Sequence, residues 1–141
     1  DVQWRARSVV LPAAPHLNEQ ALLNTLDDES LSAAARGGAA SDLAWLRRCL
    51  HQDPIQVSCL QLGPAKILHL PGEVVVEYQL AAQQEHPDDF VAVAAYGDYG
   101  PGYICLQEHY QQGGYESSPG ASRVAPQTES ILQAAIRAVL E

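Results

Sequence analysis

Two apolar runs, residues 55–62 and 65–70, constrain the fold of this chain more than any other feature of its sequence. Only Gly63-Pro64 separates them, and the first run begins with apolar and polar residues in alternation. Runs of this kind joined by a Gly-Pro turn are typical of two adjacent strands. We therefore predict a β-hairpin here, ended by Pro71-Gly72.

Strands and helices alternate along the chain after residue 54. Residues 90–96 form a continuous apolar run, which is typical of a strand buried on both faces. This alternation predicts the α/β class, with a mixed sheet and flanking helices. Helices are predicted at residues 74–84, 106–112 and 126–140.

Residues 1–53 are predicted to be a mainly helical scaffold portion of a single domain that spans residues 1–141, and residues 54–141 carry the motifs described below. Gly37-Gly38 is expected to end a short helical stretch, and Ser41 to cap the helix that follows. Asn18 is likewise expected to cap a helix. The elements predicted in this portion are a strand at 2–11 and helices at 16–26 and 42–51.

Composition limits the classes of function. The chain has 141 residues, with 17 acidic and 8 basic side chains and a net charge of -9. A chain of this length predicts one domain that needs no disulfide to fold. The acidic excess disfavours nucleic acids and anionic membranes, which bind basic surfaces. Cys49, Cys59 and Cys105 lack metal or disulfide spacing and are interpreted as buried apolar residues.

The chain begins with Asp1 rather than Met, so we expect a processed chain or a portion of a larger parent. No basic segment precedes an apolar one near the start, so we expect no signal peptide within these residues. The compartment of a larger parent, which could be secreted or periplasmic, is left open, and localisation is not predicted.

Glu73 is the first candidate for a functional site. It follows the predicted strand at 65–70 directly, at the expected N-terminus of a helix. A glutamate there can simply complement the helix dipole. Alternatively, the Pro71-Gly72 pair before it holds the backbone rigidly, as a ligand side chain requires. His69, four residues earlier, is a weaker candidate.

Tyrosines are concentrated in one segment of the chain. One reading is that they pack an irregular loop; the other is that their hydroxyls line a polar cleft as acid, metal ligand or oxyanion donor. Residues 97–102 are Gly-rich, but no Lys or Arg lies between Lys66 and Arg123. A phosphate site is therefore not predicted there. Five of the six tyrosines lie here: Tyr96, Tyr99, Tyr103, Tyr110 and Tyr115.

Three segments together resemble a known family. Residues 55–73 (ending in Pro-Gly-Glu), 99–103 (YGPGY) and 108–116 (EHYQQGGYE) look like the C-terminal part of the catalytic domain of neutral/alkaline, non-lysosomal ceramidases. The segments also resemble short ceramidase-like proteins of bacteria. The resemblance covers roughly residues 55–140 and implies a portion of a larger α/β catalytic domain.

The resemblance implies a zinc-dependent amide hydrolase, and it assigns roles to particular residues. The Glu of Pro-Gly-Glu is a zinc ligand in that family and matches Glu73, and the last Tyr of the short loop is a ligand and matches Tyr103. A Tyr twelve residues later, here Tyr115, stabilises the oxyanion. Residues that could support these ligands are His69, Asp98 and Tyr99.

The resemblance also implies what this chain lacks. The family's two His ligands come from an upstream region, so the expected partner is the upstream half of a parent chain, and the isolated chain is expected to bind zinc weakly and to have little or no activity. The expected substrate is lipid-like or another N-acyl amide. The alternative is a non-catalytic interaction or oligomerisation domain, in which the Tyr-rich loop contacts a partner or a second copy.

Overall fold

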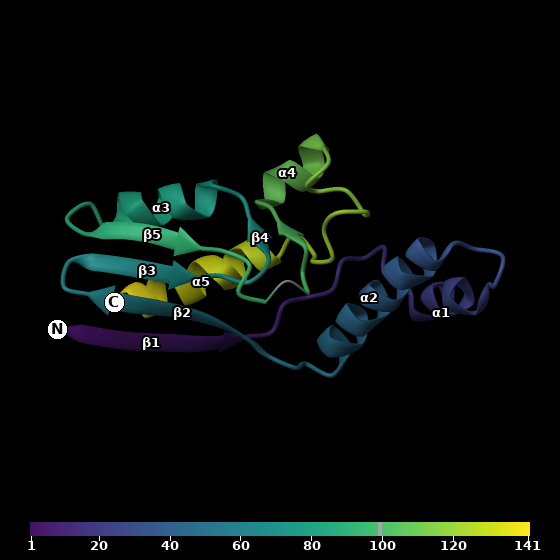
Figure 1. The fold of residues 1–141 in the computed structure, drawn as a ribbon. Helices are drawn as coiled ribbons and strands as arrows, with labels where there is room; N and C mark the ends of the chain where they lie inside the picture. The colour runs from purple at the N-terminus through teal and green to yellow at the C-terminus, as the bar shows by residue number, and fades with distance from the viewer. Residues whose placement is uncertain (99) are drawn as a thin grey trace.

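A four-stranded mixed sheet organises the chain (Figure 1). The structure is a computed structural model that describes residues 1–98 and 100–141. The strand order is β1-β2-β3-β5; the first two pairings are antiparallel and the last is parallel. The α/β class is therefore confirmed. The strands are β1 (Val2–Val9), β2 (Ile55–Leu62), β3 (Ala65–His69) and β5 (Phe90–Ala94).

The predicted hairpin is the pair β2 and β3, whose register places Leu62 opposite Ala65 across the Gly-Pro turn. The last helix, α5 (Thr128–Leu140), also lies where its apolar stripe predicted it. It packs against β1 and β2 with Leu132 and Val139 fully buried. Strand β1 pairs with β2 and so belongs to the same sheet as the strands that follow residue 54.

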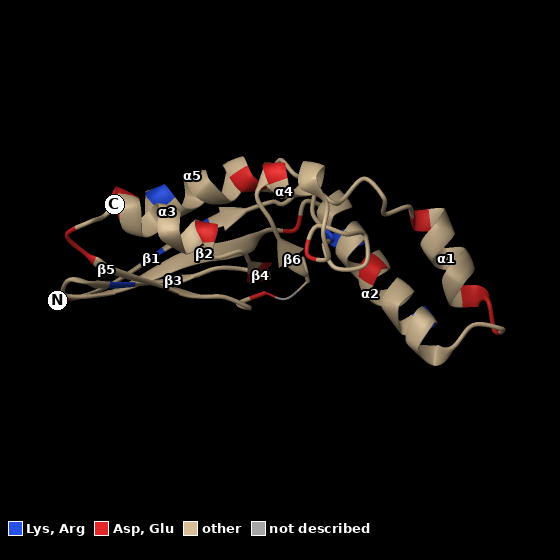
Figure 2. Cartoon of the chain, turned by 90° about the horizontal axis from the view of Figure 1, so that it is seen from above, with Lys and Arg blue, Asp and Glu red and all other residues tan. Residues whose placement is uncertain are grey.

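The two faces of the sheet differ. Helices α3 (Glu77–Glu85) and α5 cover one face, and no helix of the described residues covers the other, which is called the bare face below (Figure 2). Strand β5 therefore has only one covered face, although its apolar run predicted two. On the covered face Val57, Cys59 and Leu68 are fully buried, whereas on the bare face Trp4 is 58% exposed.

A second, two-stranded sheet pairs β4 (Glu73–Val74) in parallel with β6 (Tyr103–Ile104). The predicted helix at 74–84 is therefore wrong at its start, because α3 begins only at Glu77. Val75 donates its N–H to the carbonyl of Ile104, at 3.2 Å. This pairing with a distant segment draws the β-branched run into extended backbone, which suits its side chains.

Helices α1 (Glu19–Asp27) and α2 (Ala33–Leu50) pack on each other to one side of the sheet (Figure 1). Asn18 caps α1 as predicted, accepting from Ala21 N–H at 2.9 Å. For α2 the prediction is wrong. The helix runs unbroken through Gly37-Gly38 and is capped by Ser32, while Ser41 bonds the carbonyl of Gly37 inside it. Burial of the helix's later turns outweighs the roughly 1 kcal/mol that each interior glycine costs.

The last short helix, α4 (Gln107–Gln112), lies where the sequence predicted it. Within residues 1–98 and 100–141, no helix is both long and apolar enough to cross a membrane.

Candidate functional site

The backbone at Gly72 determines how the site is built. Gly72 has a positive φ of 63°, and a Cβ there would lie 2.6 Å from the carbonyl oxygen of Gly102. Only glycine allows the two chains to approach this closely. The next residue, Glu73, donates its N–H to the same carbonyl at 2.8 Å. Pro71-Gly72 thus delivers Glu73 to a strand, not to the helix N-terminus that the sequence suggested.

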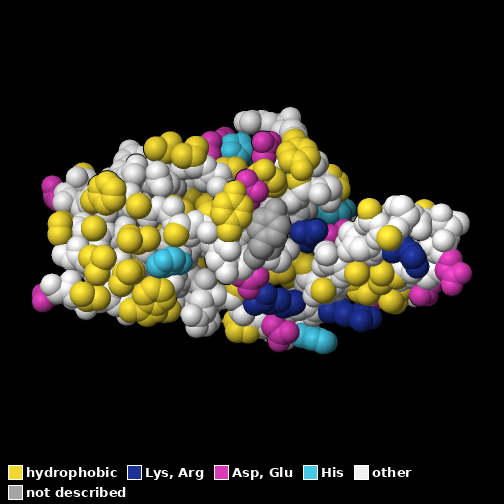
Figure 3. Space-filling model, in the orientation of Figure 1, with side chains coloured by type: hydrophobic (Ala, Val, Ile, Leu, Met, Phe, Trp, Pro, Cys, Tyr) yellow, Lys and Arg dark blue, Asp and Glu magenta, His cyan; other side chains and the backbone are white. Residues whose placement is uncertain are grey.

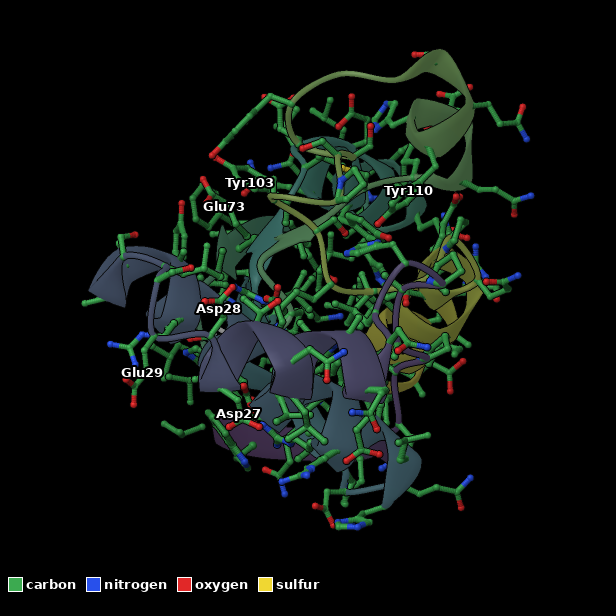
Figure 4. All side chains as sticks on the ribbon, turned by 90° about the vertical axis from the view of Figure 1, so that its right-hand side faces the viewer. Asp27, Asp28, Glu29, Glu73, Tyr103 and Tyr110 are labelled. Atoms are coloured by element: carbon green, nitrogen blue, oxygen red, sulfur yellow. The ribbon has the colours of Figure 1, made fainter. Side chains whose placement is uncertain are left out.

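Glu73 and Tyr103 are direct partners in the β4–β6 register. Their side chains lie together (Figure 4) and are joined by a hydrogen bond from the Tyr103 hydroxyl to the Glu73 carboxylate. This bond, together with the negative charge of Glu73, raises the pKa of Tyr103 to about 12. A carboxylate oxygen and a phenol oxygen, both possible metal donors, therefore converge at one point.

Tyr115 joins this pair from the loop that follows α4. Its ring packs edge-to-face on Tyr103, with the centroids 5.9 Å apart and the planes at 76°. Tyr115 is 68% exposed, so its hydroxyl is accessible to a ligand. The structure thus brings together all three residues to which the resemblance gave a role as ligand or oxyanion donor.

Glu73 and Tyr103 line a cleft with a volume of ≈ 510 Å³. Residues 74–76, all valines, form an apolar part of its wall, and Tyr78 anchors the following helix by donating its hydroxyl to the carbonyl of Cys105 at 3.3 Å. Among the described residues that line the cleft, none is Lys or Arg, whereas three are Glu. This lining disfavours anionic ligands and suits neutral ones with apolar parts.

Two residues of this cleft were missed by sequence reasoning. Glu77 and His109 face each other across it, with 3.9 Å between the Glu77 Oε1 and the His109 Nε2. Glu77 gave a weak signal, because it lies four residues after Glu73. His109 gave none, since only the packing of α4 beside β6 carries it to the cleft.

The three residues proposed to support the ligands have different positions. His69 stacks on Trp4 at the bare face of the sheet, with ring centroids 5.3 Å apart, and is not among the described residues lining the cleft. Asp98 lies beside Gly72 and accepts its N–H through the backbone carbonyl at 2.6 Å. Tyr99 lies outside the described residues.

The described residues do not by themselves supply a full set of metal ligands. In the described part of the chain, no group of three or more His, Cys, Asp or Glu side chains could hold a metal ion. Zinc sites in proteins ordinarily use three or four protein ligands. Glu73 and Tyr103 fit as two oxygen donors of such a set and do not complete one.

Comparison with solved structures decides what the fold resembles. The crystal structure of neutral ceramidase from Pseudomonas aeruginosa matches 96% of this chain with a TM-score of 0.57 and 16% sequence identity. The chain has a ceramidase-like fold. A ceramidase complexed with C2 also matches, over 59% of this chain, with a TM-score of 0.47 and 21% identity.

The match covers only part of each ceramidase. This chain spans 27% of the Pseudomonas aeruginosa enzyme and 14% of the other chain. No protein-family model matches the sequence, and no curated protein matches it. At these identities the likeness establishes the fold, and the activity is a separate matter.

Proposed function

We propose that this chain forms part of the active site of a zinc-dependent amidohydrolase that cleaves an N-acyl amide. The observation that carries the proposal is the convergence of Glu73, Tyr103 and Tyr115, which come from three separate segments. Glu73 and Tyr103 line the cleft, and Tyr115 packs on the Tyr103 ring. The ceramidase-like fold supports the same chemistry, because the structure that matches 96% of this chain is that of a neutral ceramidase.

Glu73 and Tyr103 would hold the metal. Zinc, when bound, supplies a polarised carbonyl and a water that ionises near neutral pH. Glu73 offers a carboxylate oxygen. Tyr103 would bind as its phenolate and would therefore give up its proton when the metal is bound.

Tyr115 would act on the substrate. Its hydroxyl is exposed, and its ring is held by the edge-to-face contact with Tyr103. A phenol O–H fixed near the reacting carbonyl can donate to the negative charge that develops on the carbonyl oxygen during amide cleavage. Residues 74–76 offer apolar contact to a lipid-like acyl or amine chain.

The remaining ligands, two histidines on the resemblance, would come from polypeptide outside this chain. We therefore expect weak zinc binding and little or no hydrolysis by the 141 residues alone. The partner on this proposal is the polypeptide that carries those histidines.

Calorimetric zinc titration tests the proposal. We expect Glu73→Gln and Tyr103→Phe each to weaken binding by roughly tenfold or more. Tyr110→Phe is the matched control, because Tyr110 bonds Ser122 at 2.9 Å and lies away from the pair (Figure 4). A double variant, Glu73→Gln with Tyr103→Phe, that still binds zinc like the wild type would overturn the assignment.

A second candidate function, self-association, is favoured by the bare face of the sheet. Trp4, Leu60 and Ile67 are register neighbours there, and hydrophobic side chains cover much of this face (Figure 3). The register rows of this face contain no acidic residue between β1 and β5, so two copies of a chain with net charge -9 could meet there without repulsion between carboxylates.

Sedimentation velocity distinguishes this second function. We expect a concentration-dependent dimer that Trp4→Glu abolishes. Leu80→Glu is the matched control, because Leu80 is a similarly exposed apolar residue on α3. A wild-type chain that stays monomeric at high concentration would exclude it.

A further inference from the structure

Asp98 connects the segments that carry both proposed ligands. Its backbone carbonyl accepts from Gly72 N–H at 2.6 Å, directly before Glu73. Its carboxylate accepts from Gly100 N–H at 3.2 Å, in the loop that leads to Tyr103. One residue thus bonds to the backbone on both approaches to the Glu73–Tyr103 pair.

Helix α2 holds Asp98 from outside the two sheets. The Arg48 Nη1 lies 2.6 Å from the Asp98 Oδ2, and both side chains are about two thirds buried, at 32% and 30% exposure. Arg48 is fixed in turn, since its Nη2 donates to the carbonyl of Pro54 at 3.1 Å. Partial burial with two hydrogen bonds makes this pair stronger than an exposed one.

The same helix turn supports the loop with an aromatic surface. Trp45 is buried, and a Cβ at Gly100 would lie 2.8 Å from its ring. The indole N–H donates to the carbonyl of Arg123 at 2.8 Å, and the Arg123 N–H donates to the carbonyl of Pro101. Helix α2 therefore contacts the loop through one ion pair and one close ring contact.

We propose that the Arg48–Asp98 pair is a positioning device that sets Tyr103 against Glu73. Gly97, Gly100 and Gly102 lie in this loop, and a glycine restricts its own backbone angles less than any other residue does. The pair holds the loop in one arrangement by tying it to a rigid helix. This role rests on the proposed function, because accurate placement matters most where ligand side chains must converge.

Amide hydrogen exchange measured by NMR tests the proposal without zinc. Asp98→Asn removes the charge and keeps an acceptor for Gly100, and Arg48→Gln removes the other partner. We expect either change to speed exchange at Glu73 and Val75, whose N–H groups donate to the carbonyls of Gly102 and Ile104, by roughly tenfold or more. Exchange in the β2–β3 hairpin should not change.

Two further variants sharpen the test. Arg47→Gln is the matched control, because Arg47 is the neighbouring arginine on α2 and pairs with Glu19 at 2.8 Å, away from the loop. Arg48→Lys keeps the charge and should restore most of the protection at Glu73. Zinc titration of the same variants should show weaker binding for Arg48→Gln and Asp98→Asn and unchanged binding for Arg47→Gln.

The outcomes separate the two proposals. Wild-type exchange at Glu73 and Val75 in Asp98→Asn and Arg48→Gln would overturn the positioning role. Equal acceleration in the β2–β3 hairpin would also overturn it, because it would show general destabilisation. The expected exchange pattern, together with zinc binding that the double variant Glu73→Gln with Tyr103→Phe leaves unchanged, would support the positioning role and overturn the ligand role of Glu73 and Tyr103.

Discussion

Glu73 and Tyr103 lie opposite each other in a parallel two-stranded sheet, and the Tyr103 hydroxyl hydrogen-bonds the Glu73 carboxylate. Backbone pairing and side-chain bonding thus support the same contact. Each residue follows a glycine with positive φ, Gly72 or Gly102. The pair is therefore fixed by main-chain geometry as well as by its own chemistry.

The Gly72→Ala substitution should destabilise the protein strongly. The positive φ alone costs about 1–2 kcal/mol for a residue with a Cβ. The clash of that Cβ with the Gly102 carbonyl at 2.6 Å adds roughly 1–3 kcal/mol, as overpacking does. Urea denaturation measures the loss of unfolding free energy.

Gly63→Ala is the matched control for this prediction. Gly63 has nearly the same φ, 60°, but nothing lies within 4 Å of a Cβ there. The Gly63→Ala variant should lose only the part of the unfolding free energy that the positive φ costs, about 1–2 kcal/mol. Equal losses at both positions would show that the close approach of β4 and β6 contributes nothing.

The elements that the sequence predicted well depend on local pattern. The β2–β3 hairpin follows from alternation and one Gly-Pro turn, and α5 follows from its apolar stripe. Strand β4 was missed because its partner, Tyr103-Ile104, lies far along the chain. The valines at 74–76 favour a strand, but the break at Pro71-Gly72 and the helix-favouring residues 77–84 led to the prediction of a helix.

The site was predicted from motifs, and its surroundings were not. The resemblance named Glu73, Tyr103 and Tyr115, which the fold brings together. The bond from Arg48 to Asp98 links residues on different elements, and neither residue's sequence neighbours indicate it. His69 is the opposite case. Its place four residues before Glu73 suggested that it supports the ligands, but its ring packs on Trp4 at the bare face of the sheet.

Gly37→Ala should stabilise the protein. Gly37 lies inside α2, and a Cβ there would meet nothing within 4 Å. Replacing an interior helical glycine by alanine gains about 0.5–1 kcal/mol. Thermal unfolding should show a higher Tm, and a lower Tm would contradict the continuous helix through Gly37-Gly38.

The Tyr103 phenol should titrate late. Its pKa is raised from 10.0 to about 12, first by the hydrogen bond to Glu73. Because the folded-state pKa lies above the unfolded value, this contribution to stability is complete below pH 10 and is lost between pH 10 and about 12. NMR titration of ring-labelled tyrosine in the wild type and in Glu73→Gln measures the pKa of Tyr103. The variant's pKa should fall toward 10, and an unchanged value would contradict the bond.

The most direct test of the central claim is the ultraviolet difference spectrum of the chain on zinc addition at neutral pH. Without metal the Tyr103 phenol stays protonated, and coordination requires its phenolate. The account predicts a tyrosinate band that grows with bound zinc in the wild type and in Tyr110→Phe, and is absent in Tyr103→Phe. A band of full size in Tyr103→Phe, or none in the wild type at saturating zinc, would contradict the claim that Glu73 and Tyr103 form a metal-binding pair.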